Sequence, residues 1–338
     1  MLGKIYDKFI KFIKENYKEI IFLILFYLIM TFPVPYYICI SGGTIDVGKR
    51  LEVENGYTEK GSFNLAYVSE LRGTIPTYLL SYVIPTWERI KIDSYQLNED
   101  ETMDDVSNRD KMYLLDANQS AIYVAYTKAG KTFTISDHHY YVYYVDEKAN
   151  DKIKVGDELL GVDSSNIVDL DAFKEYINTK NVGDKLNIKL KRNNKEFEVS
   201  TTVFEEEGKK YVGIAFFDLL DYEVDPSITL KFKESETGPS GGLTLSLAIY
   251  NKLVSEDITK GKKIVGTGTI DLDGTVGEIG GVKYKLLGAV KKKADVFIVP
   301  NGSNYEECIK LQKEKGYKIK IIGVDTFDDA VNKLKELK

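Results

Sequence analysis

A glycine-rich turn that holds one serine constrains this 338-residue chain more than any other stretch. It reads Gly-Pro-Ser-Gly-Gly-Leu over residues 238–243 and leads into the amphipathic run 244–250. A serine at a helix start has an exposed hydroxyl, and the free backbone N–H groups there can bind an oxyanion. The G-x-S-x-G nucleophile elbow of α/β-hydrolases also fits, but it needs an acid and then a histidine downstream. The two histidines, His138 and His139, both precede Ser240. A hydrolase triad is therefore excluded, and another base must activate Ser240 if it is a nucleophile.

The order of elements around this turn predicts a layered domain. Residues 227–232 favour a strand, and the polar residues 233–237 favour a loop before the glycine turn. Strands that alternate with helices are typical of an α/β or α+β domain. The downstream segments are a strand at 264–270, a turn at 271–274, a helix at 283–293, a strand at 294–300, a helix at 303–315, a strand at 319–324 and a helix at 326–337.

A lysine is one candidate for the missing base. Lysine acts as a general base near neutral pH only when its pKa falls to about 7–8, and burial among apolar groups lowers it in this way. Lys285 precedes the apolar residues 286, 287, 289 and 290, whereas Lys283 and Lys291–Lys293 look solvated. The pattern alone leaves two readings open, a buried base at Lys285 or another surface lysine. The pattern also leaves two roles open for Ser240: a nucleophile, or an ordinary residue of a turn and helix cap.

Composition excludes several classes of function. Acidic residues outnumber basic ones by 52 to 46, without a dense basic block in the soluble part, which argues against nucleic acid as a partner. The two cysteines, Cys39 and Cys308, are far apart and suggest neither a disulfide framework nor a metal site. We therefore expect no metal and no cofactor.

An uncharged, apolar run near the N-terminus covers residues 20–40. About 20 apolar residues span a bilayer as a helix, and a surplus of lysine before the run predicts a cytoplasmic N-terminus. We therefore expect a single-pass anchor in the cell membrane, with the rest of the chain extracellular. The alternatives are a signal peptide, cleaved near Ser41-Gly42-Gly43, and a buried core helix.

The middle of the chain resembles a PDZ domain of the bacterial protease type. The resemblance rests on residues 155–163, 170–177, 182–184 and 190–192. Residues 185–192 and 195–203 alternate about Asn193-Asn194 and predict a hairpin. The resemblance implies that an extended peptide end binds by adding a strand to a sheet edge. The nearest candidate for the glycine-rich carboxylate loop is residues 130–135. We interpret His138 and His139 as surface or edge residues in a polar turn; the alternative is a peptide-contacting or pH-responsive pair.

Three motifs then resemble the proteolytic domain of the Lon family. They are Gly-Pro-Ser-Gly-Gly at 238–242, Gly-Thr-Gly-Thr-Ile at 266–270 and Ile-Gly-Gly-Val-Lys-Tyr-Lys at 279–285, in the family's order and approximate spacing. The resemblance implies a Ser–Lys dyad of Ser240 as nucleophile and Lys285 as general base, with Thr267 bonded to the lysine. Gly241 stands where the family usually has alanine. The turn residues Gly238, Pro239, Gly241 and Gly242 would shape the turn and the oxyanion site.

Together these features resemble the membrane-anchored PDZ–Lon-like peptidases of Gram-positive bacteria, a likeness that extends to residues 113–122. It implies an α+β fold in which a β-rich, partly open-barrel PDZ domain is inserted into a Lon-type proteolytic domain that follows one transmembrane helix. The expected divisions are a cytoplasmic segment at 1–19, an anchor at 20–40, the first part of the proteolytic domain at 41–130, a PDZ-like domain at 131–204 and the catalytic domain at 205–338.

The expected function is ATP-independent cleavage of peptides, or of exposed segments of secreted and membrane proteins, because no Walker A motif occurs. In this reading Ser240 attacks the peptide carbonyl, Lys285 transfers the proton, Thr267 orients Lys285, and backbone N–H groups at or near Ser240 and Gly241 bind the oxyanion. The PDZ domain would recruit the substrate. The rival is a non-catalytic membrane scaffold that binds partner peptides through its PDZ domain.

Overall fold

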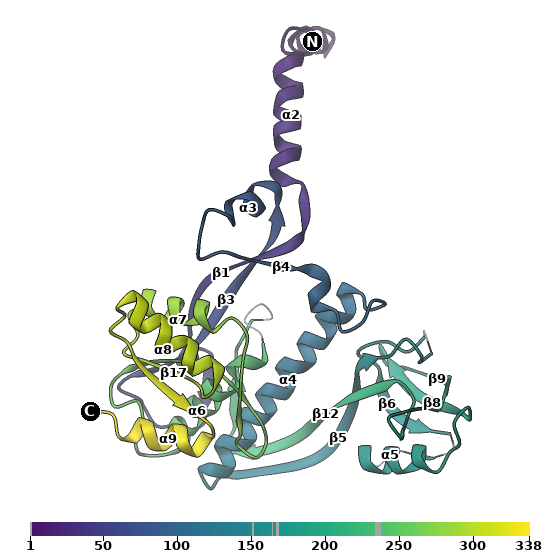
Figure 1. Cartoon of the computed structure of the whole chain (residues 1–338), viewed down its shortest axis with the longest axis vertical. Helices are drawn as coiled ribbons and strands as arrows, with labels where there is room; N and C mark the ends of the chain where they lie inside the picture. Colours follow the sequence, from purple (N-terminus) through teal and green to yellow (C-terminus); the bar gives the residue numbers. More distant parts are fainter. Residues whose placement is uncertain (1, 151, 164, 167–168, 234–237) are drawn as a thin grey trace. The chain divides into compact units, whose positions relative to one another are not determined.

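The computed structural model describes residues 2–150, 152–163, 165–166, 169–233 and 238–338 (Figure 1). The chain forms two compact units. The first contains Met1–Ser41 and Val68–Tyr95, and the second contains Gly42–Tyr67 and Gln96–Lys338.

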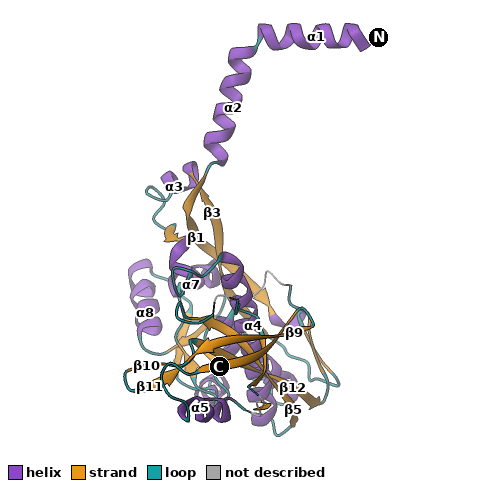
Figure 2. Ribbon diagram, turned by 90° about the vertical axis from the view of Figure 1, so that its right-hand side faces the viewer, coloured by secondary structure: helices purple, strands orange, loops and turns teal. Residues whose placement is uncertain are grey.

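The first unit contains short helices and an antiparallel strand pair. Its helices are α1 (Leu2–Glu15), α2 (Tyr17–Thr31), α3 (Ile75–Leu80) and the 3₁₀ turn η2 (Ile92–Tyr95). Figure 2 shows α1 and α2 as separate helices with a bend between them. The first part of β1 (Pro33–Asp46) pairs antiparallel with β4 (Glu88–Lys91), from Tyr36 opposite Lys91 to Cys39 opposite Glu88.

The predicted transmembrane anchor is wrong, and the membrane localisation that rested on it is corrected with it. Within the described part of the chain, no helix combines the length and the apolar character that crossing a membrane requires. The apolar run 20–40 is divided, because α2 ends at Thr31 and β1 begins at Pro33. A proline disfavours helical backbone in the residue before it, and Phe32 is extended, with φ −61° and ψ 119°. The 15 residues of α2 span only about 22 Å, whereas a bilayer core is about 30 Å thick.

A parallel sheet lies at the centre of the second unit. Strand β14 (Lys263–Gly266) pairs in parallel with β3 (Ser62–Thr74) on one side and with β17 (Val296–Pro300) on the other, and β17 pairs in parallel with β18 (Lys320–Val324). All five residues of β17 are buried, as expected of a parallel strand covered on both faces.

Helices cover both faces of this sheet. Ile264 of β14 belongs to a core shared with α4 (Met103–Lys128), α6 (Gly242–Leu253) and α9 (Phe327–Lys335). The next residue, Val265, belongs to a second core, with α7 (Val282–Lys291) and α8 (Ser303–Lys315). Successive side chains of a strand point to opposite faces of the sheet, so adjacent residues of β14 pack against the two helical layers. The predicted alternation of strands and helices is confirmed.

Smaller elements connect these layers. Strand β2 (Leu51–Val53) follows the 3₁₀ turn η1 (Val47–Lys49) and pairs with β13 (Ile228–Leu230). Strand β15 (Thr269–Ile270) pairs with β16 (Val276–Gly277). The 3₁₀ turn η3 (Pro239–Gly241) directly precedes α6.

A long two-stranded ribbon extends from the end of α4 into the PDZ-like part. Helix α4 begins with a capping box between Thr102 and Asp105, and Gly130, with φ +65°, follows its C-terminal cap. Strand β5 (Thr132–Val145) then pairs with β12 (Ile214–Asp225) along its whole length. Residues 130–135, the candidate carboxylate loop, are therefore a helix stop and the start of this ribbon.

The PDZ-like part is an antiparallel sheet packed on a short helix. Its strand order is β12, β5, β6 (Glu158–Val162), β8 (Lys185–Arg192) and β9 (Lys195–Thr202), with β7 (Ser165–Asn166) paired to β6. Helix α5 (Leu170–Asn178) is capped by Asp169, and β10 (Phe204–Glu206) and β11 (Lys209–Tyr211) form a hairpin. The predicted β8–β9 hairpin is confirmed, and Asn193 and Asn194 take the positive φ values, 50° and 60°, of its tight turn.

The packing of α6 should dominate the stability of the catalytic part. Leu247 is fully buried in the core around α6, so Leu247→Ala should lower the free energy of unfolding by about 2–5 kcal/mol. Leu272 is 47% exposed, so the control Leu272→Ala should change it by less than about 0.5 kcal/mol. Urea denaturation followed by circular dichroism measures both. Equal effects of the two substitutions would contradict the assignment of α6 to the core.

Candidate active site

Ser240 lies in the 3₁₀ turn η3, immediately before α6. Gly238, with φ +141°, starts this turn in a conformation that favours glycine. The next glycines are required by close packing. A Cβ on Gly241 would lie 3.0 Å from Leu65 Cδ2, and one on Gly242 would lie 2.8 Å from Ile270 Cγ2. The glycines therefore let the turn pack closely against β3 and β15 and hold Ser240 in one position.

Backbone hydrogen bonds fix the turn to the 266–270 motif. The N–H of Gly268 donates to the carbonyl of Ser240 at 2.8 Å, and the N–H of Leu243 donates to the carbonyl of Gly268 at 3.1 Å. The hydroxyl of Thr267 also donates to the Ser240 carbonyl, at 3.0 Å. Two segments that are separate in the sequence are therefore bound together around the serine.

Lys285 points from α7 to the same place. Its Nζ lies 2.9 Å from Ser240 Oγ and 3.2 Å from Thr267 Oγ1. The side chain is buried, and Lys285 is only 5% exposed. Gly281, with φ +67°, caps the start of α7. The structure thus brings together Ser240 of η3, Lys285 of α7 and Thr267, which lies between β14 and β15.

Burial lowers the pKa of Lys285 to about 8 from its ordinary value of 10.5. The cause is desolvation, because a buried ammonium loses hydration that a neutral amine hardly needs. A lysine with this pKa is partly neutral at physiological pH and can accept a proton there.

The other turn residues have separate parts in the geometry. Pro239 cannot donate a hydrogen bond to an oxyanion, because proline has no backbone N–H. The N–H of Gly242 donates to the carbonyl of Pro239. Both residues therefore shape the turn, and any oxyanion donors must come from elsewhere in it. Residues 234–237, which fall within the predicted loop 233–237, lie outside the described residues.

Sequence reasoning missed the residues that hold the turn from outside. Leu65 and Ile270 limit the space at Gly241 and Gly242, and Gly268 supplies the backbone bond to Ser240. Gly268 and Ile270 lie in the 266–270 motif, so a signal for them was present. Leu65 lies in a strand whose alternating pattern does not distinguish it from its neighbours.

The two histidines lie in strand β5 and not in a turn. His138 Nδ1 lies 2.9 Å from each carboxylate oxygen of Asp218. His139 lies between Glu158, at 2.7 Å from Nδ1, and Asp221, at 3.1 Å from Nε2. The hydrogen bond with Glu158 is the largest cause that raises the pKa of His139. The contacts with Asp218 and Asp221 join the two strands of the ribbon, and the contact with Glu158 joins the ribbon to β6 of the PDZ-like part. Among the described residues, no group of three or more His, Cys, Asp or Glu side chains is arranged to hold a metal ion.

Comparison with known proteins assigns two regions of the chain to families. Residues 233–336 match the Lon protease (S16) C-terminal proteolytic domain, and residues 106–203 match a PDZ domain. A PDZ domain of an SdrC-like protein from Listeria innocua is 29% identical and covers 23% of this chain and 92% of that one, with a TM-score of 0.22.

Several curated relatives are Lon proteases. That of Campylobacter jejuni is 39% identical over 95 residues, which are 28% of this chain and 12% of the relative. That of Malacoplasma penetrans is 39% identical over 98 residues, 29% of this chain and 12% of the relative. The chain thus spans about an eighth of the length of these relatives. The matches support a serine peptidase that carries a Lon-type proteolytic domain and a PDZ domain.

The lowered pKa of Lys285 can be measured without any substrate. The Nζ signal of ¹⁵N-lysine-labelled protein should titrate near pH 8, because burial disfavours the ammonium. The Lys285→Arg variant, which lacks this signal, assigns it. A Lys285 signal that titrates near the ordinary lysine value of 10.5 would contradict the burial argument.

Proposed function

We propose that the chain is an ATP-independent serine endopeptidase that uses a Ser240–Lys285 dyad. One observation supports this proposal above all others: a lysine that is 5% exposed places its Nζ 2.9 Å from the hydroxyl of a serine in a glycine turn. That distance permits direct proton transfer. Hydrolysis by this pair needs no nucleotide, and the 338 residues contain no Walker A motif.

Acylation uses the neutral form of Lys285. The Ser240 hydroxyl donates to the lysine lone pair, loses its proton to Nζ as Oγ bonds to the scissile carbonyl carbon, and leaves a tetrahedral oxyanion. As the C–N bond breaks, the Lys285 ammonium returns the proton to the leaving amine. The products are an ester on Ser240 and the released amine end of the substrate.

Deacylation repeats the sequence with water. Lys285 takes a proton from the attacking water, and the ammonium returns it to Ser240 Oγ as the ester bond breaks, which restores both groups. Backbone N–H groups at or near Ser240 and Gly241, at the positive end of α6, bind the oxyanion in both steps. Thr267 orients Lys285, since its Oγ1 lies 3.2 Å from Nζ while its hydroxyl is bonded to the Ser240 carbonyl.

The magnitude of the pKa change decides whether the lysine can work. With a pKa of about 8, about a tenth of the protein carries neutral Lys285 at pH 7. An unshifted lysine would be neutral in only about one molecule in 3,000 at that pH. Burial therefore increases the competent fraction by about 300-fold.

The PDZ-like part supplies a place for substrate ends. Strand β12 is the first strand in the order of that sheet, so one of its edges faces away from β5. Extended peptides bind PDZ domains by adding a strand to such an edge. We therefore propose peptides or exposed segments of proteins as substrates, with the PDZ domain recruiting them.

Removing either member of the dyad should abolish cleavage. Ser240→Ala and Lys285→Ala should each lower kcat/KM for an unstructured fluorogenic peptide by at least about 10³-fold, since nucleophile and base act as one unit. Thr267→Val should have a smaller effect, about 10-fold or more, through a loss of kcat at unchanged KM. Lys291→Ala, at the exposed end of the same helix as Lys285, is the control and should retain wild-type rates.

The same variants separate the peptidase from the rival scaffold. If the protein is a scaffold, the wild type and all four variants should bind peptide equally well. None of these five proteins should cleave it. If Ser240→Ala and Lys285→Ala cleave as fast as the parent, the dyad is wrong. The proximity of Ser240 to a buried lysine favours the peptidase, because peptide binding alone requires neither group.

A further inference from the structure

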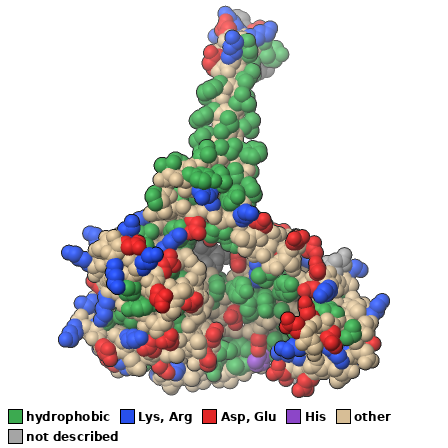
Figure 3. Space-filling view, in the orientation of Figure 1, with side chains coloured by type: hydrophobic (Ala, Val, Ile, Leu, Met, Phe, Trp, Pro, Cys, Tyr) green, Lys and Arg blue, Asp and Glu red, His purple; other side chains and the backbone are tan. Residues whose placement is uncertain are grey.

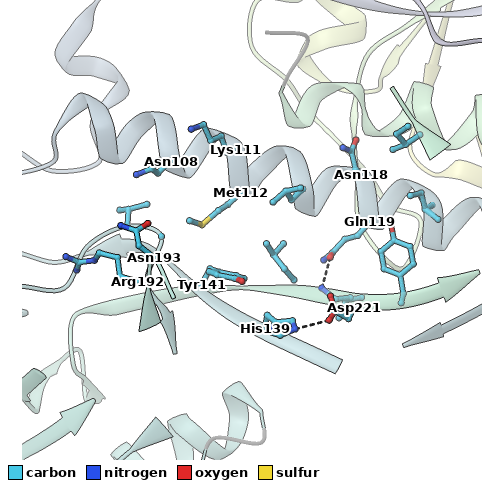
Figure 4. A pocket seen from close by; sticks show the side chains of 18 of the residues that line it. Asn108, Lys111, Met112, Asn118, Gln119, His139, Tyr141, Arg192, Asn193 and Asp221 are labelled. Carbon is cyan, nitrogen blue, oxygen red and sulfur yellow. Dashed lines mark hydrogen bonds and ion pairs between the residues drawn. The ribbon is translucent and has the colours of Figure 1, made fainter. Parts of the chain in front are cut away.

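A large groove lies between α4 and the β5–β12 ribbon, and the dyad does not use it. Its volume is about 1140 Å³, above the usual 300–1,000 Å³ of a small-molecule pocket. Figure 4 shows α4 along one side and the ribbon along the other, with Met112 and Tyr141 facing into the space. In Figure 3 hydrophobic side chains gather on this hollowed face, over α4 and β12. We call it the α4–ribbon groove.

One face of α4 forms the apolar wall of the groove. Met112, Leu115, Gln119 and Ile122 recur at intervals of three and four residues, so they share one side of the helix. Leu115 is 52% exposed there. The ribbon contributes Leu219 and Tyr141 opposite this wall. An apolar occupant would remove this exposed surface from water.

A side-chain amide already occupies the outer edge of β12 in this groove. Gln119 Nε2 donates to the carbonyl of Asp218 at 2.9 Å, and its Oε1 accepts from the N–H of Leu220 at 2.9 Å. The N–H and C=O of one residue in a parallel neighbouring strand bond an edge in the same way, to residues on either side of that residue's partner. A strand added along β12 is therefore interrupted between Asp218 and Leu220. A chain that continues beyond this point must leave the edge and follow the groove.

The groove is lined by residues of both parts that the proposed peptidase needs. They include Lys154–Gly156 and Arg192 of the PDZ-like part and Ile228 and Leu230 of β13. The chain reaches the serine turn soon after Leu230, and α4 itself contacts η3. Neutral amides of Asn108 and Asn118 offer hydrogen bonds to a main chain between the apolar side chains.

We propose that the α4–ribbon groove binds an extended, apolar segment of the substrate polypeptide, between the end held by β12 and the bond cut at Ser240. Leu115 and Met112 contact its side chains, and Gln119 directs it off the edge of β12. The proposal rests on the proposed function and adds a substrate class: unfolded polypeptides long enough to fill the groove, in preference to short peptides.

Kinetics with two substrates test the groove. Leu115→Glu should lower kcat/KM for an unstructured, leucine-rich peptide of about 20 residues by about tenfold or more, mainly through KM, because a charge replaces an apolar contact. It should leave a peptide of about six residues, too short to fill the groove, unchanged. Val182 is 56% exposed in a turn of the PDZ-like part, so Val182→Glu is the matched control and should change neither rate.

A footprint tests the groove without cleavage. In the Ser240→Ala background, the thiol of the Leu115→Cys variant should be alkylated by a maleimide, while Cys39 and Cys308 react slowly because both are buried. The 20-residue peptide should slow alkylation at position 115 by about tenfold at saturation, and it should not slow that of the Val182→Cys variant.

Each outcome decides one claim. If fluorescence anisotropy shows that the peptide is bound but alkylation at position 115 is unchanged, the groove proposal is wrong. It is also wrong if Leu115→Glu and wild type cleave the long peptide at equal rates. Absence of peptide binding would overturn it as well. If instead the peptide protects position 115 while Ser240→Ala and Lys285→Ala still cleave, the groove stands and the dyad fails.

Discussion

The burial of one amino group is the constraint on which the rest of the site depends. The pKa of Lys285 falls from 10.5 to about 8 because α7 places the side chain away from water, and this difference costs about 3 kcal/mol for the charged form. The folded protein therefore binds fewer protons than the unfolded chain between about pH 8 and 10.5, so this residue's penalty is largest below pH 8 and disappears as the pH rises to 10.5. The cores on the two faces of the sheet offset that penalty.

The rigid surroundings of Ser240 explain why so many glycines occur near it. Gly241 and Gly242 allow the turn to touch Leu65 and Ile270, and Gly268 bonds to the serine carbonyl. A side chain at Gly242 would displace the turn from β15, and with it the hydroxyl that must stay 2.9 Å from Lys285 Nζ. The motifs are thus contact surfaces between separate elements as well as sources of reactive groups.

Much of the catalytic part could be predicted from the sequence, because its signals are local. Alternating strands and helices follow from residue periodicity, and the glycine motifs mark the turns that meet at Ser240. Helix α4 begins at Met103, and hydrophobic periodicity does not predict this start because the first turns of the helix are polar. Pro33 follows the end of α2 and starts β1, so the apolar run is divided between a helix and a strand. Hydropathy alone does not predict this division. The edge position of β12 and the groove beside Gln119 depend on long-range pairing, which a single sequence does not reveal.

The pH dependence of kcat/KM for a short unstructured peptide tests the central claim most directly. If neutral Lys285 is the base, the rate should rise with pH, reach half its maximum near pH 8, and level off above, because the ammonium form cannot accept a proton. The Ser240→Ala variant measures the background. A rate that is independent of pH between about 6 and 9, or a rise that persists in Lys285→Met, would contradict the account.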